Sequence, residues 1–275
     1  GDKAHMGLAL ESRGQAARHR GQYAQAIALH QASLSLAQEI RSPYLVSSAE
    51  INLGILAMRT GDFARARELF DKNLTWMASV RNKRGRAWLL ALKGRVVAWQ
   101  AEYEQAHALL DESLALHRDM GEQDIPHTHS MFRAEFHYQE GKLDQAAGEY
   151  QDTLGRLDPE ERIDRSVILL GLGNIAWLRG EHALARKLLA ESAQLAEAMH
   201  DLWNQCMIFR ATGLAWLADG DIPQAKRLVK RGLSLALDIG DQHNMARGLE
   251  RLGLIAQRQG PPDCRLLDFG VAQNL

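Results

Sequence analysis

Apolar residues recur along this 275-residue chain with the spacing of amphipathic helices. One helical stripe, between about residues 43 and 59, consists of Leu45, Ala49, Leu53, Leu56 and Ala57. Gly61 and Asp62 then interrupt the pattern, and a second stripe runs from Ala66 to Met77. The alternation of β-branched and polar residues that is typical of strands is nearly absent. The pattern therefore predicts an all-α chain.

This pair of stripes repeats about every forty residues. Each copy starts with a glycine, usually followed by an aromatic or aliphatic residue two positions later and by an alanine five positions later. The copies start at Gly21, Gly61, Gly141, Gly180 and Gly220, with a degenerate copy at Ala101 and a last start at Gly260. A second small residue lies seven positions before each start, at Gly14, Gly54, Gly94, Ala134, Gly173, Gly213 and Gly253. Two registers kept over seven periods predict a unit made of helix A, a short turn and helix B.

Small residues in the middle of helix A and near the start of helix B let the two helices approach closely. One pair leaves about half of its apolar surface exposed, so neighbouring pairs are expected to stack into a solenoid. We expect this solenoid over residues 7–260, with six complete pairs and a seventh helix A, from about 242 to 259, as a cap. Residues 1–6 are expected to be an expression-tag remnant, and residues 261–275 a tail that is docked or disordered.

The unit resembles the tetratricopeptide repeat. The shared features are the small residue, the glycine seven positions later, the aromatic residue and alanine that follow, and then a bulky residue such as Phe70 or Tyr150. The units differ from the usual repeat of about 34 residues, because they are longer and lack its final proline. This longer variant is similar to the sensor domain of MalT-type bacterial transcription activators and to the LGN/Pins group of adaptor proteins. The resemblance implies a right-handed α–α superhelix with a binding surface and no chemistry of its own.

Composition narrows the classes of function. A formal net charge of −1 gives no overall field that would recruit nucleic acid or an anionic membrane. No apolar run approaches the roughly 18 to 20 residues of a membrane-spanning helix. Cys206 and Cys264 are too few and too far apart for a disulfide framework or a metal site, so a cytoplasmic setting is expected. Cys206 lies in an apolar run and is interpreted as a core thiol.

Residues typical of catalysis or metal binding do not form a complete set. The Asp-Phe-Gly tripeptide at 268–270 matches a protein-kinase motif, but the other kinase motifs are missing from the sequence. His127, His129 and His137 lack an acidic or cysteine partner at a ligand spacing and are interpreted as ordinary surface and groove histidines. We therefore expect no enzymatic activity, no cofactor and no metal.

A positive cluster lies between the second helix B and the third helix A. It consists of Arg81, Lys83, Arg84 and Arg86. One interpretation is a contact with an acidic partner or a nucleic acid, and the other is a solvated turn whose charge the rest of the chain offsets. The solvated turn is preferred.

In the family that the chain resembles, the A helices line a concave surface, and residues that flank the small position face inward. The candidate binding residues are Arg95, Trp99, Met131, Glu135, Tyr138, Asn174, Trp177 and Arg210. Aromatic anchors beside a few polar groups are typical of recognition sites, although Trp177 and Tyr138 could instead seal contacts between helices. Arg95 and Arg210 must reach water or an acid, because a buried guanidinium without a partner is costly. On the seventh helix the same register gives Glu250, Leu254 and Gln257.

These residues favour a non-catalytic scaffold that binds a protein or peptide segment, or a small effector, in its concave groove. By resemblance it could be the sensing domain of a MalT-like (STAND/LuxR-type) transcriptional regulator. The alternatives are a structural adaptor that bridges complexes and a solenoid that associates with itself. Repeat modules that clamp a C-terminal carboxylate use Lys, Asn and Arg at five positions, at which this chain has Glu11, Gln15, Asn52, Trp88 and Leu92. Only Asn52 fits, so that type of clamp is not expected.

Overall fold

The computed structural model describes residues 2–122 and 126–258. All regular structure in these ranges is helical, which confirms the all-α prediction. The helices are α1 (Asp2–His19), α2 (Tyr23–Glu39), α3 (Pro43–Thr60), α4 (Phe63–Ser79), α5 (Lys83–Trp99), α6 (Tyr103–Asp119), α7 (His127–Gln139), α8 (Leu143–Arg156), α9 (Arg162–Leu178), α10 (His182–Ala198), α11 (Leu202–Ala218), α12 (Ile222–Ile239) and α13 (Gln242–Arg258). As predicted, the described residues form six helix pairs followed by one last helix. None of these helices is long and apolar enough to cross a membrane.

The two ends of the chain relate differently to this array. Helix α1 begins at Asp2, so residues 2–6 continue the first helix. Their origin as an expression-tag remnant stays a prediction. The expected tail at 261–275, which includes Cys264 and the Asp-Phe-Gly tripeptide, lies outside the described residues.

Every turn between paired helices contains one residue in the left-handed conformation. Gly61, which ends α3, has φ +89°, and the carboxylate of Asp62 then caps α4 by accepting from the backbone N–H of Arg65 at 3.0 Å. In the degenerate third unit Ala101 keeps the same geometry, with φ +64°. A side chain in this conformation costs about 1 kcal/mol, so the turn survives the loss of its glycine.

The small residues lie where the paired helices cross. A Cβ added to Gly213 would lie 2.5 Å from a methyl of Val229 and 3.0 Å from the carbonyl oxygen of Ala225. At Gly54 it would lie 2.6 Å from the Phe70 ring. The alanines on the facing helices, at positions such as Ala225, are fully buried. Gly253 differs, because an added Cβ there meets nothing within 4 Å. The predicted crossings are therefore correct for the six pairs but not for α13, which has no described helix B to pack against.

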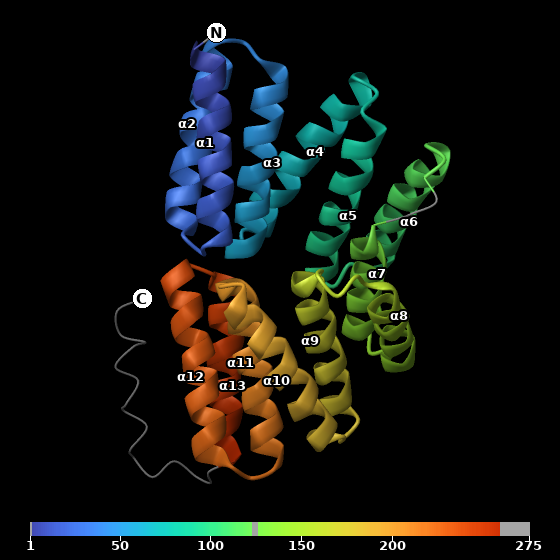
Figure 1. Cartoon of the computed structure of the whole chain (residues 1–275), viewed down its shortest axis with the longest axis vertical. Coiled ribbons are helices and arrows are strands. Elements are labelled where there is room, and N and C mark those ends of the chain that lie inside the picture. Colours follow the sequence, from blue (N-terminus) through green and yellow to red (C-terminus); the bar gives the residue numbers. More distant parts are fainter. Residues whose placement is uncertain (1, 123–125, 259–275) are drawn as a thin grey trace.

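The array curves until its first and last pairs meet. Figure 1 shows the ends of α1–α3 against the ends of α11–α13. An apolar cluster joins them, with Ala17, Tyr23 and Leu56 on one side and Trp203 and Ile239 on the other. Contacts in this array therefore also join pairs that are not neighbours in the sequence. The regular rotation from one pair to the next returns the chain to its start, where exposed apolar side chains can be buried.

Candidate functional site

The concave side of the array encloses a cavity of about 460 Å³. Its walls come mainly from the helices with odd numbers, α3, α5, α7, α9, α11 and α13, which are the A helices of the repeat. This volume is in the range of sites that hold a small ligand or several peptide side chains. The concave surface is thus formed by the helices that the sequence predicts.

Seven of the eight candidate binding residues line this cavity. They are Arg95, Trp99, Glu135, Tyr138, Asn174, Trp177 and Arg210. Met131 does not line it, and this assignment is corrected here. Its side chain is buried between α7, α8 and α9, against Tyr150 and Ile168. A flexible thioether can turn away from the groove to fill an irregular gap in the core.

Arg95 has the acid that the sequence analysis requires. Its Nε donates to Glu135 Oε2 at 2.9 Å, and Trp99 Nε1 donates to Glu135 Oε1 at 2.9 Å. The guanidinium also lies over the rings of Trp99 at 4.8 Å and Trp203 at 5.3 Å. On this wall of the cavity, Arg95, Trp99 and Glu135 therefore pair with one another.

Arg210 has no such acid. None of the described carboxylates lies within ion-pair distance of its guanidinium. Burial and, after it, the positive charges of Arg247 and Arg251 lower the pKa of Arg210 to about 10, against the opposing effects of Tyr138 and Asp241. Tyr138 lies in the same region, because the charges of these three arginines oppose the rise in its pKa that burial causes. One end of the cavity is therefore positively charged.

Aromatic residues from both ends of the chain close the cavity. The rings of Trp99 and His243 stack with centroids 5.6 Å apart, and Trp203 lies 6.4 Å from Trp99. The Arg59 guanidinium lies 4.4 Å above the Trp203 ring. The pKa of His243 is lowered to about 4 by burial and by Arg247 and Arg210, so the ring is neutral near pH 7.

Sequence reasoning missed the contribution of the last repeat. The cavity residues that it did not name include Arg59, Trp203, His243, Arg247 and Arg251. The residues predicted on the seventh helix, Glu250, Leu254 and Gln257, do not line the cavity. The closure of the array turns the face of α13 that carries His243, Arg247 and Arg251 inward. The spacing of Arg247 and Arg251, four residues apart on one helical face, is the only sequence signal of this.

The positive turn before α5 is matched by acidic residues of this chain. Lys83 pairs with Asp119, Arg84 with Glu122 and Arg86 with Glu112. These pairs lie along α6 and the turn after it. The arrangement agrees with a turn whose charge the chain itself offsets.

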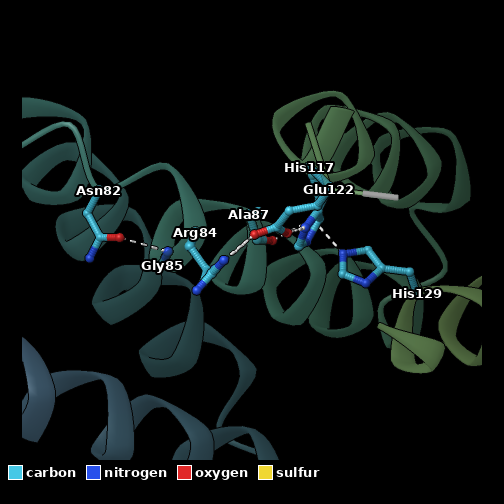
Figure 2. Close-up of polar contacts among 8 residues, drawn as sticks. Asn82, Arg84, Gly85, Ala87, His117, Glu122 and His129 are labelled. Carbon is cyan, nitrogen blue, oxygen red and sulfur yellow. Dashed lines mark hydrogen bonds and ion pairs between the residues drawn. The ribbon is translucent and has the colours of Figure 1, made fainter. Parts of the chain in front are cut away.

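A polar cluster beside this turn holds the one histidine that was assigned wrongly to the surface or groove. Figure 2 shows Arg84, Glu122, His117 and His129 side by side. Ser113 Oγ donates to the carbonyl of Ala87 at 2.6 Å and lies 2.7 Å from His129 Nε2. His129 is only 3% exposed. The serine proton is used on a backbone carbonyl in the core, so this Ser–His pair is a structural joint between α5, α6 and α7.

One group of side chains has donor atoms placed as metal ligands. His107, His137 and Glu140 offer atoms that lie within 4.8 Å of one another. Of the three histidines considered from sequence, only His137 takes part, and its partners come from α6 and from the end of α7. The Lys142 ammonium lies 2.9 Å from Glu140 Oε2 and supplies a positive charge there. The group is thus held by an ion pair of the chain itself.

Comparisons with known proteins agree on the fold. Residues 44–119 match the family model of the tetratricopeptide repeat. No curated protein sequence matches the chain significantly. The structure of NprR in complex with its cognate peptide NprX superimposes with a TM-score of 0.69 at 15% identity, over 93% of this chain and 77% of that one. The Rap conjugation gene regulator of plasmid pLS20, in complex with the Phr* peptide, gives 0.68 at 12% identity, over 90% and 73%.

A larger protein also contains this fold. The STAND protein from Pyrococcus horikoshii with a tetratricopeptide-repeat sensor matches with a TM-score of 0.57 at 13% identity, over 83% of this chain. The matched region spans 34% of the STAND protein's length. At these identities the likenesses show the shared helical solenoid.

Proposed function

Because residues 44–119 match the tetratricopeptide-repeat model and the described helices form a solenoid of the same kind, we propose that this chain is a binding module that holds a peptide or protein segment in its concave cavity. The observation that carries the proposal is the cavity itself. Seven side chains from four A helices, each within five residues of the small position of its helix, line it, and they combine aromatic surfaces with a few polar groups. Binding sites for peptides and small molecules have this composition.

The similar solenoids support a peptide as the ligand. NprR and the Rap regulator are each seen in complex with a peptide, and each covers 90% or more of this chain at similar TM-scores. The role of a sensing domain in a larger regulator is supported in the same way by the STAND protein, whose sensor is built from these repeats. In this proposal the repeats bind and report, and any output is made by other parts of a regulator.

A binding screen with matched variants tests the proposal. Short peptides are added to the protein, and the unfolding midpoint is followed, because a ligand that binds only the folded state raises it. Trp177→Ala removes a cavity wall, whereas Trp88→Ala makes the same chemical change at a side chain that is 45% exposed and outside the cavity. We expect roughly tenfold or greater loss of affinity from the first variant and little change from the second.

Two results would contradict the proposal. One is a peptide that binds Trp177→Ala and Trp88→Ala as tightly as the unchanged protein. The other is a screen in which no peptide binds. Self-association in light scattering would then favour the alternative of a solenoid that uses its ends, where α13 exposes Leu249 and Leu254.

A further inference from the structure

The cavity carries more positive than negative charge. Its arginines are Arg59, Arg95, Arg210, Arg247 and Arg251, and its acids are Glu135 and Asp241. Both acids are already engaged. Glu135 accepts from Arg95 and Trp99, and Asp241 accepts from the backbone N–H and the side-chain amide of Asn244 at 2.9 and 2.7 Å. Among the described residues, Arg95 is paired with Glu135 and Arg247 has a long ion pair with Glu250, whereas Arg59, Arg210 and Arg251 have no carboxylate partner.

This excess is concentrated between α11 and α13. Arg210 comes from α11, and Arg247 and Arg251 come from one face of α13. The three like charges are close enough for Arg247 and Arg251 to lower the pKa of Arg210. Arg247 has only a long ion pair with Glu250, at 3.7 Å. Three neighbouring guanidinium groups repel one another unless an anion lies between them.

Two residues that line the cavity have unused hydrogen-bond donors. Arg251 Nε is buried and has no hydrogen-bond partner. Trp177 lines the cavity, and its buried Nε1–H also has no acceptor. A buried donor without an acceptor costs about 1 to 3 kcal/mol, so a ligand that supplies acceptor oxygens gains that energy on binding.

We propose that the ligand presents an anionic oxygen group, a carboxylate or a phosphate, to Arg210, Arg247 and Arg251, with Trp177 Nε1–H as a neutral donor. The inference rests on the proposed function and adds the chemistry of the ligand. Guanidinium groups bind carboxylate and phosphate through paired, charge-assisted hydrogen bonds. Trp203 and His243 border the same space and suit an apolar or flat group beside the anion.

This site differs from the carboxylate clamp that was tested on the sequence. That clamp uses the first three A helices of a repeat module, where this chain has Glu11, Gln15, Asn52, Trp88 and Leu92. The arginines here come from the last two A helices. Their approach to Tyr138 on α7 depends on the curvature of the whole array.

Peptide pools that differ by one group test the inference. Labelled hexapeptide pools contain either one Glu or one Gln, each with a free or an amidated C-terminus, and binding is followed by fluorescence anisotropy. We expect the Glu pools, or the pools with a free C-terminus, to bind roughly tenfold more tightly than their neutral counterparts. Arg210→Gln and Arg251→Gln should reduce this preference to within about threefold.

A second arm uses inorganic phosphate alone, with chloride at the same ionic strength as control. Phosphate should raise the unfolding midpoint of the unchanged protein but not that of Arg210→Gln or Arg251→Gln. Arg227→Gln is the matched control, because it removes one positive charge from the exposed face of α12. Without any ligand, Arg210→Gln should unfold at the same or a higher temperature than the unchanged protein, since it relieves repulsion with Arg247 and Arg251.

The outcomes separate this inference from the proposed function. A charge preference that both glutamine variants abolish supports a carboxylate. A phosphate effect without a peptide preference supports a phosphate-bearing ligand. Peptides that bind in a Trp177-dependent manner without any charge preference, and no phosphate effect, would overturn the inference and leave the proposed function standing. If no peptide binds, the proposed function fails, and the phosphate arm alone decides whether the anion site exists.

Discussion

In α1, α3, α5, α9 and α11 a neighbouring helix leaves little room for a side chain at the glycine in the middle of the helix. At Gly213 the nearest atoms include the carbonyl oxygen of Ala225, at 3.0 Å from an added Cβ, and a backbone atom cannot move aside cheaply. We expect Gly213→Ala to destabilise the protein by about 2 kcal/mol, in the range of overpacked cores. Thermal or urea unfolding measures this change.

Gly253 provides a control at the same position of the repeat. Nothing lies within 4 Å of an added Cβ there, so alanine should stabilise α13 by about 0.5 to 1 kcal/mol through its helix propensity. The two substitutions are therefore expected to have opposite signs. Equal effects would mean that the close approach of α11 and α12 does not exist in solution.

At the scale of the helices, the joint between α5, α6 and α7 depends on a neutral histidine. Burial and the nearby charge of His117 lower the pKa of His129 to about 4, against the opposing effect of a hydrogen bond with the Pro126 backbone. The folded protein therefore binds this proton more weakly than the unfolded chain does. The free energy of unfolding should fall as the pH is lowered from about 6.5 to about 4, by up to about 3 kcal/mol for this group.

His129→Gln removes this titration while keeping a donor for Ser113. The slope of stability against pH in this window should become shallower by up to about 1.4 kcal/mol per pH unit. Some slope should remain, because the pKa of buried His243 is also lowered to about 4. His200→Gln, at an exposed position, is the control. If His129→Gln and His200→Gln give the same slope, the joint does not depend on a neutral ring.

The sequence periodicity predicted the structural features that recur in each helix pair. The glycine and alanine registers located the crossings, and the positions that flank Gly94 and Gly173 gave Arg95 and Asn174 as cavity residues. The prediction that Met131 lines the cavity was wrong. Its unbranched side chain starts at an inward position but packs into the core beside α8 and α9. The register fixes where a side chain starts, and its rotamer decides which surface it covers.

The residues that periodicity could not predict are those that meet because the array closes. His243, Arg247 and Arg251 reach the cavity from one face of α13, whereas the repeat pattern pointed to Glu250 and Leu254, which do not line it. A repeat specifies how one helix pair packs on the next. The small rotations between successive pairs add up along the chain, and their sum brings the first and last pairs together.

At the scale of the whole molecule, this meeting encloses the cavity. Trp99 stacks on His243, and Arg59 covers Trp203, so residues of α3 and α5 are held against residues of α11 and α13. In an open array these four side chains would face water. The shape of the ligand site therefore depends on contacts between segments that are distant in sequence.

A disulfide between the turn after α3 and helix α13 tests directly whether the first and last helices of the array meet. An ideal Cβ on Gly61 lies 3.4 Å from the Cβ of His243, close to the separation of about 3.5 to 4.5 Å in disulfides. With Cys264 replaced by serine, Gly61→Cys/His243→Cys should oxidise to an internally cross-linked monomer, seen as faster migration on a non-reducing gel. Cys206 should not compete, because burial raises the pKa of its thiol.

Gly220→Cys/His243→Cys is the control, since Gly220 has a similar positive φ but no neighbour within 4 Å of an added Cβ. Free thiols in both variants would mean that the ends stay apart in solution, and a ligand would then meet an open groove in which Trp99 and Trp203 form separate walls.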